Sequence, residues 1–177
     1  MRLTYKPSLF LRRSVMILLI GGITTACSVR FNFTGTQGVD DSLETLSIET
    51  FLNEAQIVVP YLAQELTQQM QDRFLNQSRL TLTSGAADIQ LSGSINRYAI
   101  SPVAISGNNT ADQNRLTIGV KIKFDNNVAP DDSWEQTFSK FVDFDASNDF
   151  TSLEEDLINE ILEQITQDVF SKSVGKW

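Results

Sequence analysis

Histidine and cysteine, the side chains that most often act as general bases, nucleophiles and transition-metal ligands, are almost absent from this sequence. It contains no histidine and a single cysteine, Cys27, among 177 residues. Catalytic Ser–His and Cys–His pairs and histidine-ligated metal sites are therefore excluded by composition. The sequence also lacks a phosphate-binding P-loop and a dinucleotide-binding glycine pattern. We therefore expect no enzymatic activity, no bound metal and no dissociable cofactor.

Carboxylates are the remaining candidates for catalysis. Asp143 and Asp145 lie two residues apart at the end of an expected strand, as a pair of hydrolytic acids could. A solvated strand end that leads into a turn is the simpler interpretation. The acidic pairs at 40–41 and 131–132 could contact a cation, but neither lies in a loop with calcium-ligand spacing.

Basic residues are scarce beyond the N-terminus, so their positions are informative. Lys121 and Lys123 alternate with apolar residues and project from the opposite face of their strand. Arg115 precedes this strand, and Arg97 lies in the strand before it. Together they could form a positive stripe for an anionic group such as a phosphate or a sugar acid. Alternatively, the lysines pair across a hairpin with acidic residues and bind no ligand. The acids in reach are Glu135 and Asp143.

Cys27 follows a segment with the features of a secretory signal peptide. Residues 1–13 contain basic residues and no acid, and an apolar run at 15–20 precedes small residues. The apolar run is too short to span a bilayer, which takes about 20 residues. Residues 24–27 resemble a bacterial lipobox, in which the cysteine sulfur is diacylated, although Thr24 stands where Leu, Val or Ile is usual. We expect a lipid anchor on Cys27; the alternative is an ordinary signal peptide with a free cysteine.

The charge differs sharply between the leader and the rest of the chain. Residues 1–26, the predicted lipoprotein signal peptide, carry four of the 14 basic residues and none of the 22 acidic ones. The remainder therefore has ten basic and 22 acidic residues, a net charge of −12. Such a surface argues against nucleic acid as a partner. Residues 27–43 are expected to form the lipidated N-terminus and a tether, and 44–177 a single domain.

Apolar periodicity predicts the elements that position these groups. Strands are predicted over 44–51, 79–83, 89–100, 116–124 and 134–144, the last two as an antiparallel hairpin. Pro102 restricts the end of the third strand to a sheet edge or a bulge. Four-residue spacing predicts an amphipathic helix over 60–77.

A second helix is predicted near the C-terminus. A capping box formed by Thr151 and Glu154 begins it, and an apolar stripe continues to Phe170. Because each helix has one apolar face, both can cover the same side of the sheet. The expected fold is α+β, a two-layer α/β sandwich with two amphipathic helices on one face of a mixed four- to five-stranded sheet.

Several stretches, taken in order, resemble the LptE family, the lipopolysaccharide-assembly lipoproteins of Gram-negative outer membranes, in a short form. Besides the lipid-anchored Cys27, they are residues 93–98, 101–105, 114–124 and the closing acidic helix that ends near Trp177. No single motif is chemically diagnostic; the specificity comes from their order and extent over nearly all of the mature chain.

The resemblance implies a non-enzymatic component of lipopolysaccharide export. It implies an outer-membrane lipoprotein that faces the periplasm and the lumen of a large β-barrel partner, helps that barrel assemble, and contacts lipopolysaccharide. By analogy with the family, the residues expected to contact the anionic glycolipid are Arg97, Arg115, Lys121 and Lys123. The alternative function is a free-standing periplasmic lipoprotein that binds a lipid or a peptide by itself.

Overall fold

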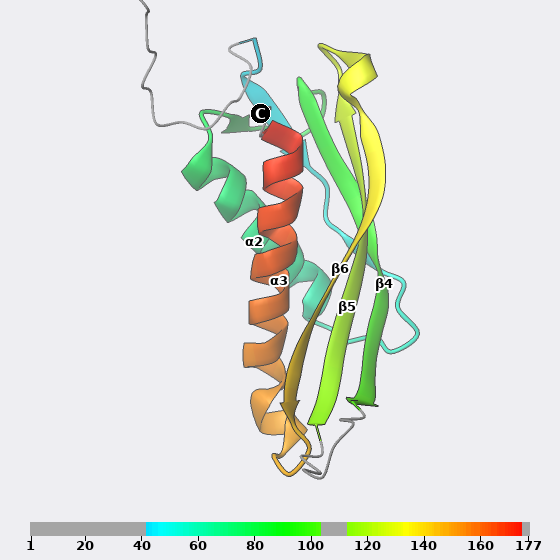
Figure 1. Cartoon of the computed structure of the whole chain (residues 1–177). Helices are drawn as coiled ribbons and strands as arrows, with labels where there is room; N and C mark the ends of the chain where they lie inside the picture. Colours follow the sequence, from blue (N-terminus) through cyan, green and yellow to red (C-terminus); the bar gives the residue numbers. More distant parts are fainter. Residues whose placement is uncertain (1–41, 104–112, 175–177) are drawn as a thin grey trace, which may run out of the picture. The chain divides into compact units, whose positions relative to one another are not determined.

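The computed structural model describes residues 42–103 and 113–174 (Figure 1). Cys27, the predicted signal peptide, most of the predicted tether and Trp177 lie outside these residues. The described part falls within one compact unit. Its strands are β1 (Thr45–Ile48), β2 (Leu52–Asn53), β3 (Thr81–Leu82), β4 (Ile89–Val103), β5 (Gln113–Asn126) and β6 (Trp134–Asp145). Its helices are α2 (Leu62–Gln77), the 3-10 turn η1 (Pro130–Asp132) and α3 (Phe150–Val174).

These elements form the predicted two-layer α+β fold. The sheet has the strand order β3-β1-β4-β5-β6, and β2 also pairs with β4. The short strand β1 pairs in parallel with β3 and β4, and β2 pairs in parallel with β4, whereas β4, β5 and β6 form an antiparallel meander. Both helices lie on one face of the sheet, as Figure 1 shows. The predicted hairpin is confirmed, and Pro102 lies where β4 pairs only with β5.

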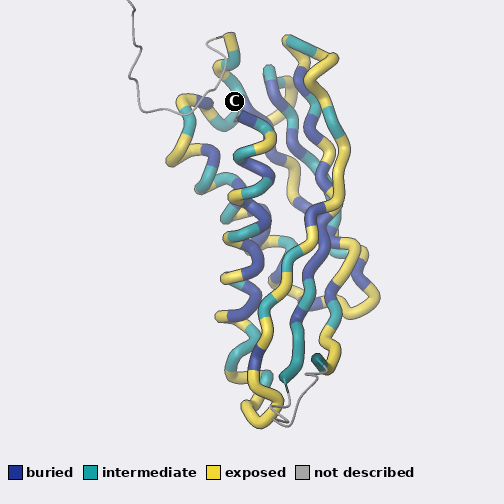
Figure 2. The backbone as a smooth tube through the Cα atoms, in the orientation of Figure 1, coloured by how far each residue is buried: buried dark blue, intermediate teal, exposed yellow. Residues whose placement is uncertain are grey.

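The core lies between the sheet and the helices, where the buried positions gather in Figure 2. Every second residue of β5 from Leu116 to Phe124 is buried, as strand periodicity requires. The two helices meet through Phe74 and Phe170, whose ring centroids are 5.2 Å apart in an edge-to-face arrangement. Because the apolar residues of the helices and of β5 are buried against each other, the opposite face of the sheet stays uncovered.

The sheet has six strands, one more than predicted, because the strand predicted over 44–51 ends at Ile48 and a separate short strand, β2, follows Phe51. The Phe51 side chain is buried in the core, and its backbone N–H donates to the Thr67 hydroxyl of α2 instead of to β4. The Thr67 hydroxyl in turn donates to the Ala63 carbonyl. Gly93 of β4 makes room for the Phe51 ring, which would lie 3.1 Å from a Cβ at that position.

The start of α3 corrects one detail of the sequence prediction. Asp149, not Thr151, caps this helix: its side chain accepts the backbone N–H of Thr151, and the helix begins at Phe150. Glu154 does not close a capping box, because its carboxylate accepts the Tyr98 hydroxyl at 2.6 Å. In the part of the chain that is described, neither helix is both long and apolar enough to cross a membrane.

Candidate functional site on the open sheet face

The sheet face opposite the helices, called here the open face, carries all four predicted basic residues. Lys121 and Lys123 are exposed there, as strand alternation predicts. Arg115 shares their parity on β5 and lies on the same face. Arg97 of β4 lies opposite Gly119 of β5 and so enters the gap between Arg115 and Lys121. The four cations thus follow one line over eight residues of β5, roughly 27 Å.

A β-bulge places Arg97 in this line. Ile95 and Tyr98 are both buried although they are three residues apart, and the register of β4 on β5 shifts between Ile95 and Arg97. The extra residue turns both Asn96 and Arg97 outward, where they are exposed. On the inner side, burial and the hydrogen bond to Glu154 raise the pKa of Tyr98. Regular alternation over 89–100 gave no signal for this bulge.

Three of the four cations form ion pairs on the open face. Lys121 Nζ lies 2.7 Å from Glu135, and Arg115 donates twice to Asp143, at 2.6 and 2.8 Å. Lys123 Nζ lies 2.6 Å from Asp125 on its own strand, not from the acids predicted across the hairpin. These pairs are open to solvent, which screens their charges, so they contribute little to stability. The pairing interpretation is therefore confirmed for Lys121 and wrong in partner for Lys123.

Arg97 differs from its neighbours. Within residues 42–103 and 113–174, no ion pair or hydrogen bond involves its side chain. It lines a hollow of about 540 Å³ together with uncharged groups. The other residues of this lining are Gln56, Asn96, Tyr98, Ala99, Gly119, Thr137 and Ser139. We call this the bulge hollow.

A second hollow, of about 290 Å³, has a different charge. Lys121 and Lys123 line it together with three glutamates. Its uncharged lining comes from Leu52 and the small residues of β4 and the β1–β2 connection; the glutamates are Glu49, Glu54 and Glu135. We call this the mixed-charge hollow. Its carboxylates offset both lysines, so an anion would gain less here than beside Arg97.

The aspartates considered for hydrolysis are engaged elsewhere. The Arg115 guanidinium holds the pKa of Asp143 below its usual range. Hydrogen bonds from Ser147 likewise lower the pKa of Asp145. A glycosidase acid needs a raised pKa to stay protonated. This pair therefore lacks a general acid.

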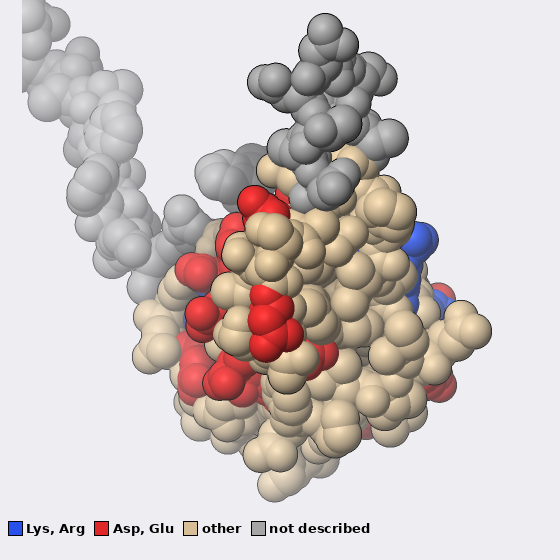
Figure 3. Space-filling view, turned by 90° about the horizontal axis from the view of Figure 1, so that it is seen from below, with Lys and Arg blue, Asp and Glu red and all other residues tan. Residues whose placement is uncertain are grey.

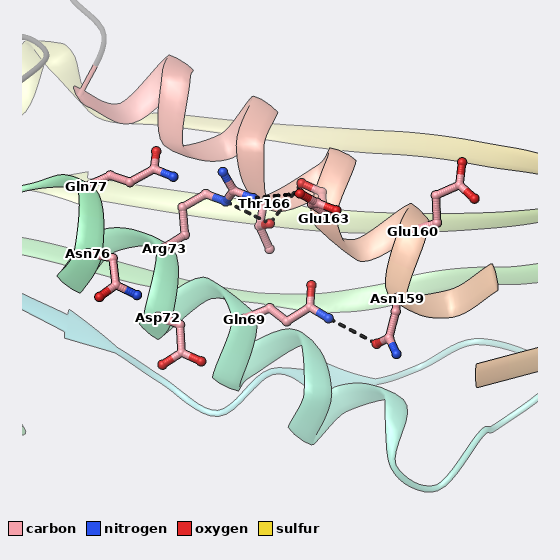
Figure 4. Close-up of a pocket in the computed structure, with 9 residues that line it drawn as sticks. All are labelled: Gln69, Asp72, Arg73, Asn76, Gln77, Asn159, Glu160, Glu163 and Thr166. Carbon is pink, nitrogen blue, oxygen red and sulfur yellow. Dashed lines mark hydrogen bonds and ion pairs between the residues drawn. The ribbon is translucent and has the colours of Figure 1, made fainter. Parts of the chain in front are cut away.

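A polar groove on the helix side, between α2 and α3, was not expected from the sequence (Figure 4). Arg73 is its central residue: Nε donates to Thr166 at 3.2 Å, Nη1 donates to Gln167, and Nη2 lies 3.9 Å from Glu163. Gln69 donates to Asn159 across the same groove at 3.1 Å. Its central cation is therefore already satisfied, and the groove is a polar seam between helices.

Charge is distributed unevenly around the molecule. In the view along the molecule from the end at which α3 begins, acidic side chains gather on one flank, and basic side chains show on the opposite flank (Figure 3). Basic side chains thus lie mainly on one flank, where carboxylates pair with most of them. Such asymmetry favours a defined orientation toward an anionic ligand.

A family model described as lipopolysaccharide-assembly, LptE, matches residues 43–173. The chain belongs to the LptE family. The match spans nearly all of the described residues, including both helices and every strand of the open face. No curated protein matches the chain significantly. Membership confirms the resemblance on which the sequence prediction relied.

Solved structures resemble this chain at low sequence identity, and the first of the three described below shows the same fold. A protein from Xanthomonas campestris has a TM-score of 0.51 and 12% identity, with 77% of this chain and 86% of that chain covered. A minor lipoprotein from Acinetobacter baumannii has a TM-score of 0.48 and 12% identity, with 72% and 89% covered. The rare lipoprotein B from Shewanella oneidensis has a TM-score of 0.47 and 16% identity, with 72% and 92% covered.

Proposed function

We propose that this chain is a non-enzymatic outer-membrane lipoprotein that partners a large β-barrel to assemble it and to transport lipopolysaccharide to the cell surface. Membership in the lipopolysaccharide-assembly family over residues 43–173 carries this proposal. The polarity of the uncovered sheet face supports it, because a domain enclosed by a hydrated barrel needs a polar surface toward the lumen.

The open face is the proposed contact surface. Its side chains alternate between hydroxyls, amides and charges, and its exposed aromatic residue, Phe141, is covered by the Arg115 guanidinium at 3.6 Å from the ring centroid. Such a face suits a glycolipid headgroup or a barrel wall better than acyl chains. Arg97, Arg115, Lys121 and Lys123 are its proposed contacts with the glycolipid.

The proposed anchor is Cys27. Each buried methylene of an acyl chain contributes about 0.8 kcal/mol, so two or three chains hold a protein on a bilayer almost permanently. Intact-mass measurement of the mature protein tests this step: we expect a chain that begins at Cys27 and carries acyl groups. A mature N-terminus without lipid would refute the anchor.

Co-purification from membranes tests the partnership. The tagged full chain is solubilised in a mild detergent, captured and analysed by mass spectrometry, with an unrelated tagged lipoprotein as the control. We expect a large outer-membrane β-barrel protein in stoichiometric amount. A monomeric chain with no barrel protein would contradict the proposal and favour a free-standing ligand-binding lipoprotein.

A further inference from the structure

We propose that the bulge hollow binds a single phosphate group, held by Arg97 on one side and by the hydroxyls of Thr137 and Ser139 on the other. If the phosphate belongs to lipopolysaccharide, the site rests on the proposed function and identifies the phosphate groups of the glycolipid as the part that binds the open face. Phosphate binding itself does not depend on the proposed function, because it is argued from the geometry of β4, β5 and β6 alone.

The register of the sheet forms the walls of the hollow. Arg97 of β4 lies opposite Gly119 of β5, and Gly119 lies opposite Ser139 of β6. Neighbouring strands are about 4.8 Å apart, so Arg97 and Ser139 stand roughly 10 Å apart on the same face. Gly119 places no side chain between them. A ligand above Gly119 can therefore reach both walls.

The glycine at the floor leaves room for the two outward residues of the bulge. A Cβ at Gly119 would lie 2.8 Å from Asn96 Oδ1 and 3.1 Å from Arg97 Cβ. Any side chain there would push aside the two outward residues of the bulge. The β-bulge turns Arg97 outward, and Gly119 leaves the space beside it free of a side chain.

The charges that line the two hollows favour an anion in the bulge hollow over one in the mixed-charge hollow. Among the described residues, the lining of the bulge hollow contains one cation and no carboxylate. The mixed-charge hollow contains two lysines and three glutamates. An anion in the bulge hollow thus displaces no ion pair, whereas an anion beside Lys121 competes with Glu135 at 2.7 Å.

The donors match a phosphate group. A guanidinium presents paired N–H donors that bind two phosphate oxygens at once. The Thr137 and Ser139 hydroxyls and the Asn96 amide can donate to the remaining oxygens. A metal cation would lack carboxylate ligands, and an acyl chain would lack an apolar lining. A phosphate is therefore the ligand class that this lining fits.

Phosphate titration of the full chain in detergent micelles tests the site. Inorganic phosphate is added at constant ionic strength to isotope-labelled protein, and amide shifts are followed by NMR. We expect saturable shifts centred on Asn96, Arg97, Gly119 and Ser139, and weaker effects from acetate. Shifts that do not saturate, or that centre on Lys121 and Lys123, would overturn the proposal.

Variants separate the site from general electrostatics. Arg97→Gln should weaken phosphate binding at least tenfold. Lys172→Gln, which removes one positive charge from α3 on the helix side, should leave it unchanged. Gly119→Ala should also weaken binding, by filling the floor. Thermal unfolding checks that each variant folds. Equal phosphate affinity in Arg97→Gln and the wild type would refute the site.

A competition experiment identifies the source of the phosphate. Intact lipopolysaccharide should displace bound inorganic phosphate, and phosphatase-treated lipopolysaccharide should do so at least tenfold less well. Equal competition by both forms would refute the glycolipid assignment. This outcome is independent of the co-purification result: a missing barrel contradicts the proposed function, whereas absent phosphate binding contradicts the site.

Discussion

Gly93 should be among the least replaceable residues of the sheet. A Cβ at Gly93 would lie 2.1 Å from the Lys121 carbonyl oxygen and 3.1 Å from the Phe51 ring. The carbonyl belongs to the backbone of β5, so relief requires a shift of the central strand pair. Overpacking typically costs about 1–3 kcal/mol, and a backbone wall places Gly93→Ala near the upper end. We expect a loss of about 3 kcal/mol.

Gly85 supplies the matched control. Its φ of +104° is unfavourable for alanine, but a Cβ there would meet nothing within 4 Å. Gly85→Ala therefore tests backbone strain without steric conflict and should lose about 1 kcal/mol. The corresponding fall in melting temperature should be about 10 °C for Gly93→Ala and about 3 °C for Gly85→Ala.

Urea unfolding followed by circular dichroism and tryptophan fluorescence measures the difference. Trp134 is a suitable reporter because it stacks on Phe124 in the same sheet, with ring centroids 5.4 Å apart. A loss in Gly93→Ala no larger than in Gly85→Ala would refute the reasoning, since it would mean that β4 and β5 separate at little cost.

Three further predictions concern the core, the inner side of the bulge and the first strand. Phe170→Ala should lose about 3–5 kcal/mol in urea unfolding, because it leaves a cavity between the helices. Tyr98→Phe should lose about 1.5 kcal/mol through its missing bond to Glu154, and no loss would show that water replaces this bond. Hydrogen bonds from Thr45 and backbone N–H groups hold the pKa of Asp88 below its usual range, so its contribution is present above about pH 4 and lost as pH falls through the folded pKa. Asp88→Asn should therefore unfold more easily at pH 7 and show a weaker pH dependence below about pH 4; an unchanged pH profile would contradict this.

Periodicity was sufficient to predict the layers of the fold. The four-residue spacing from Leu62 to Phe74 and the alternation from Leu116 to Phe124 each report burial on one side, and burial is what the two layers require. The pattern is less informative about the residue at which a helix begins. Asp149 and Thr151 are both good caps, and the chain uses the first one.

The candidate site was predictable in its residues but not in its pairing. Alternation placed Lys121 and Lys123 on the open face, yet it could not show that Lys123 pairs with Asp125 along its own strand. The bulge at Asn96 was also hidden, because one extra residue in a ladder leaves no signature in composition. Arg97 consequently stands apart from the other cations for a reason visible only in three dimensions.

Site-specific photo-crosslinking in intact membranes tests the central claim most directly. A crosslinking residue replaces Thr117 on the open face, and a second chain carries it at Glu160 beside the groove between the helices. The account predicts that Thr117 crosslinks to a large β-barrel protein or to lipopolysaccharide, with a clearly weaker product from Glu160. Crosslinks from Glu160 alone, or none from either position, would contradict an open face that serves as the contact surface.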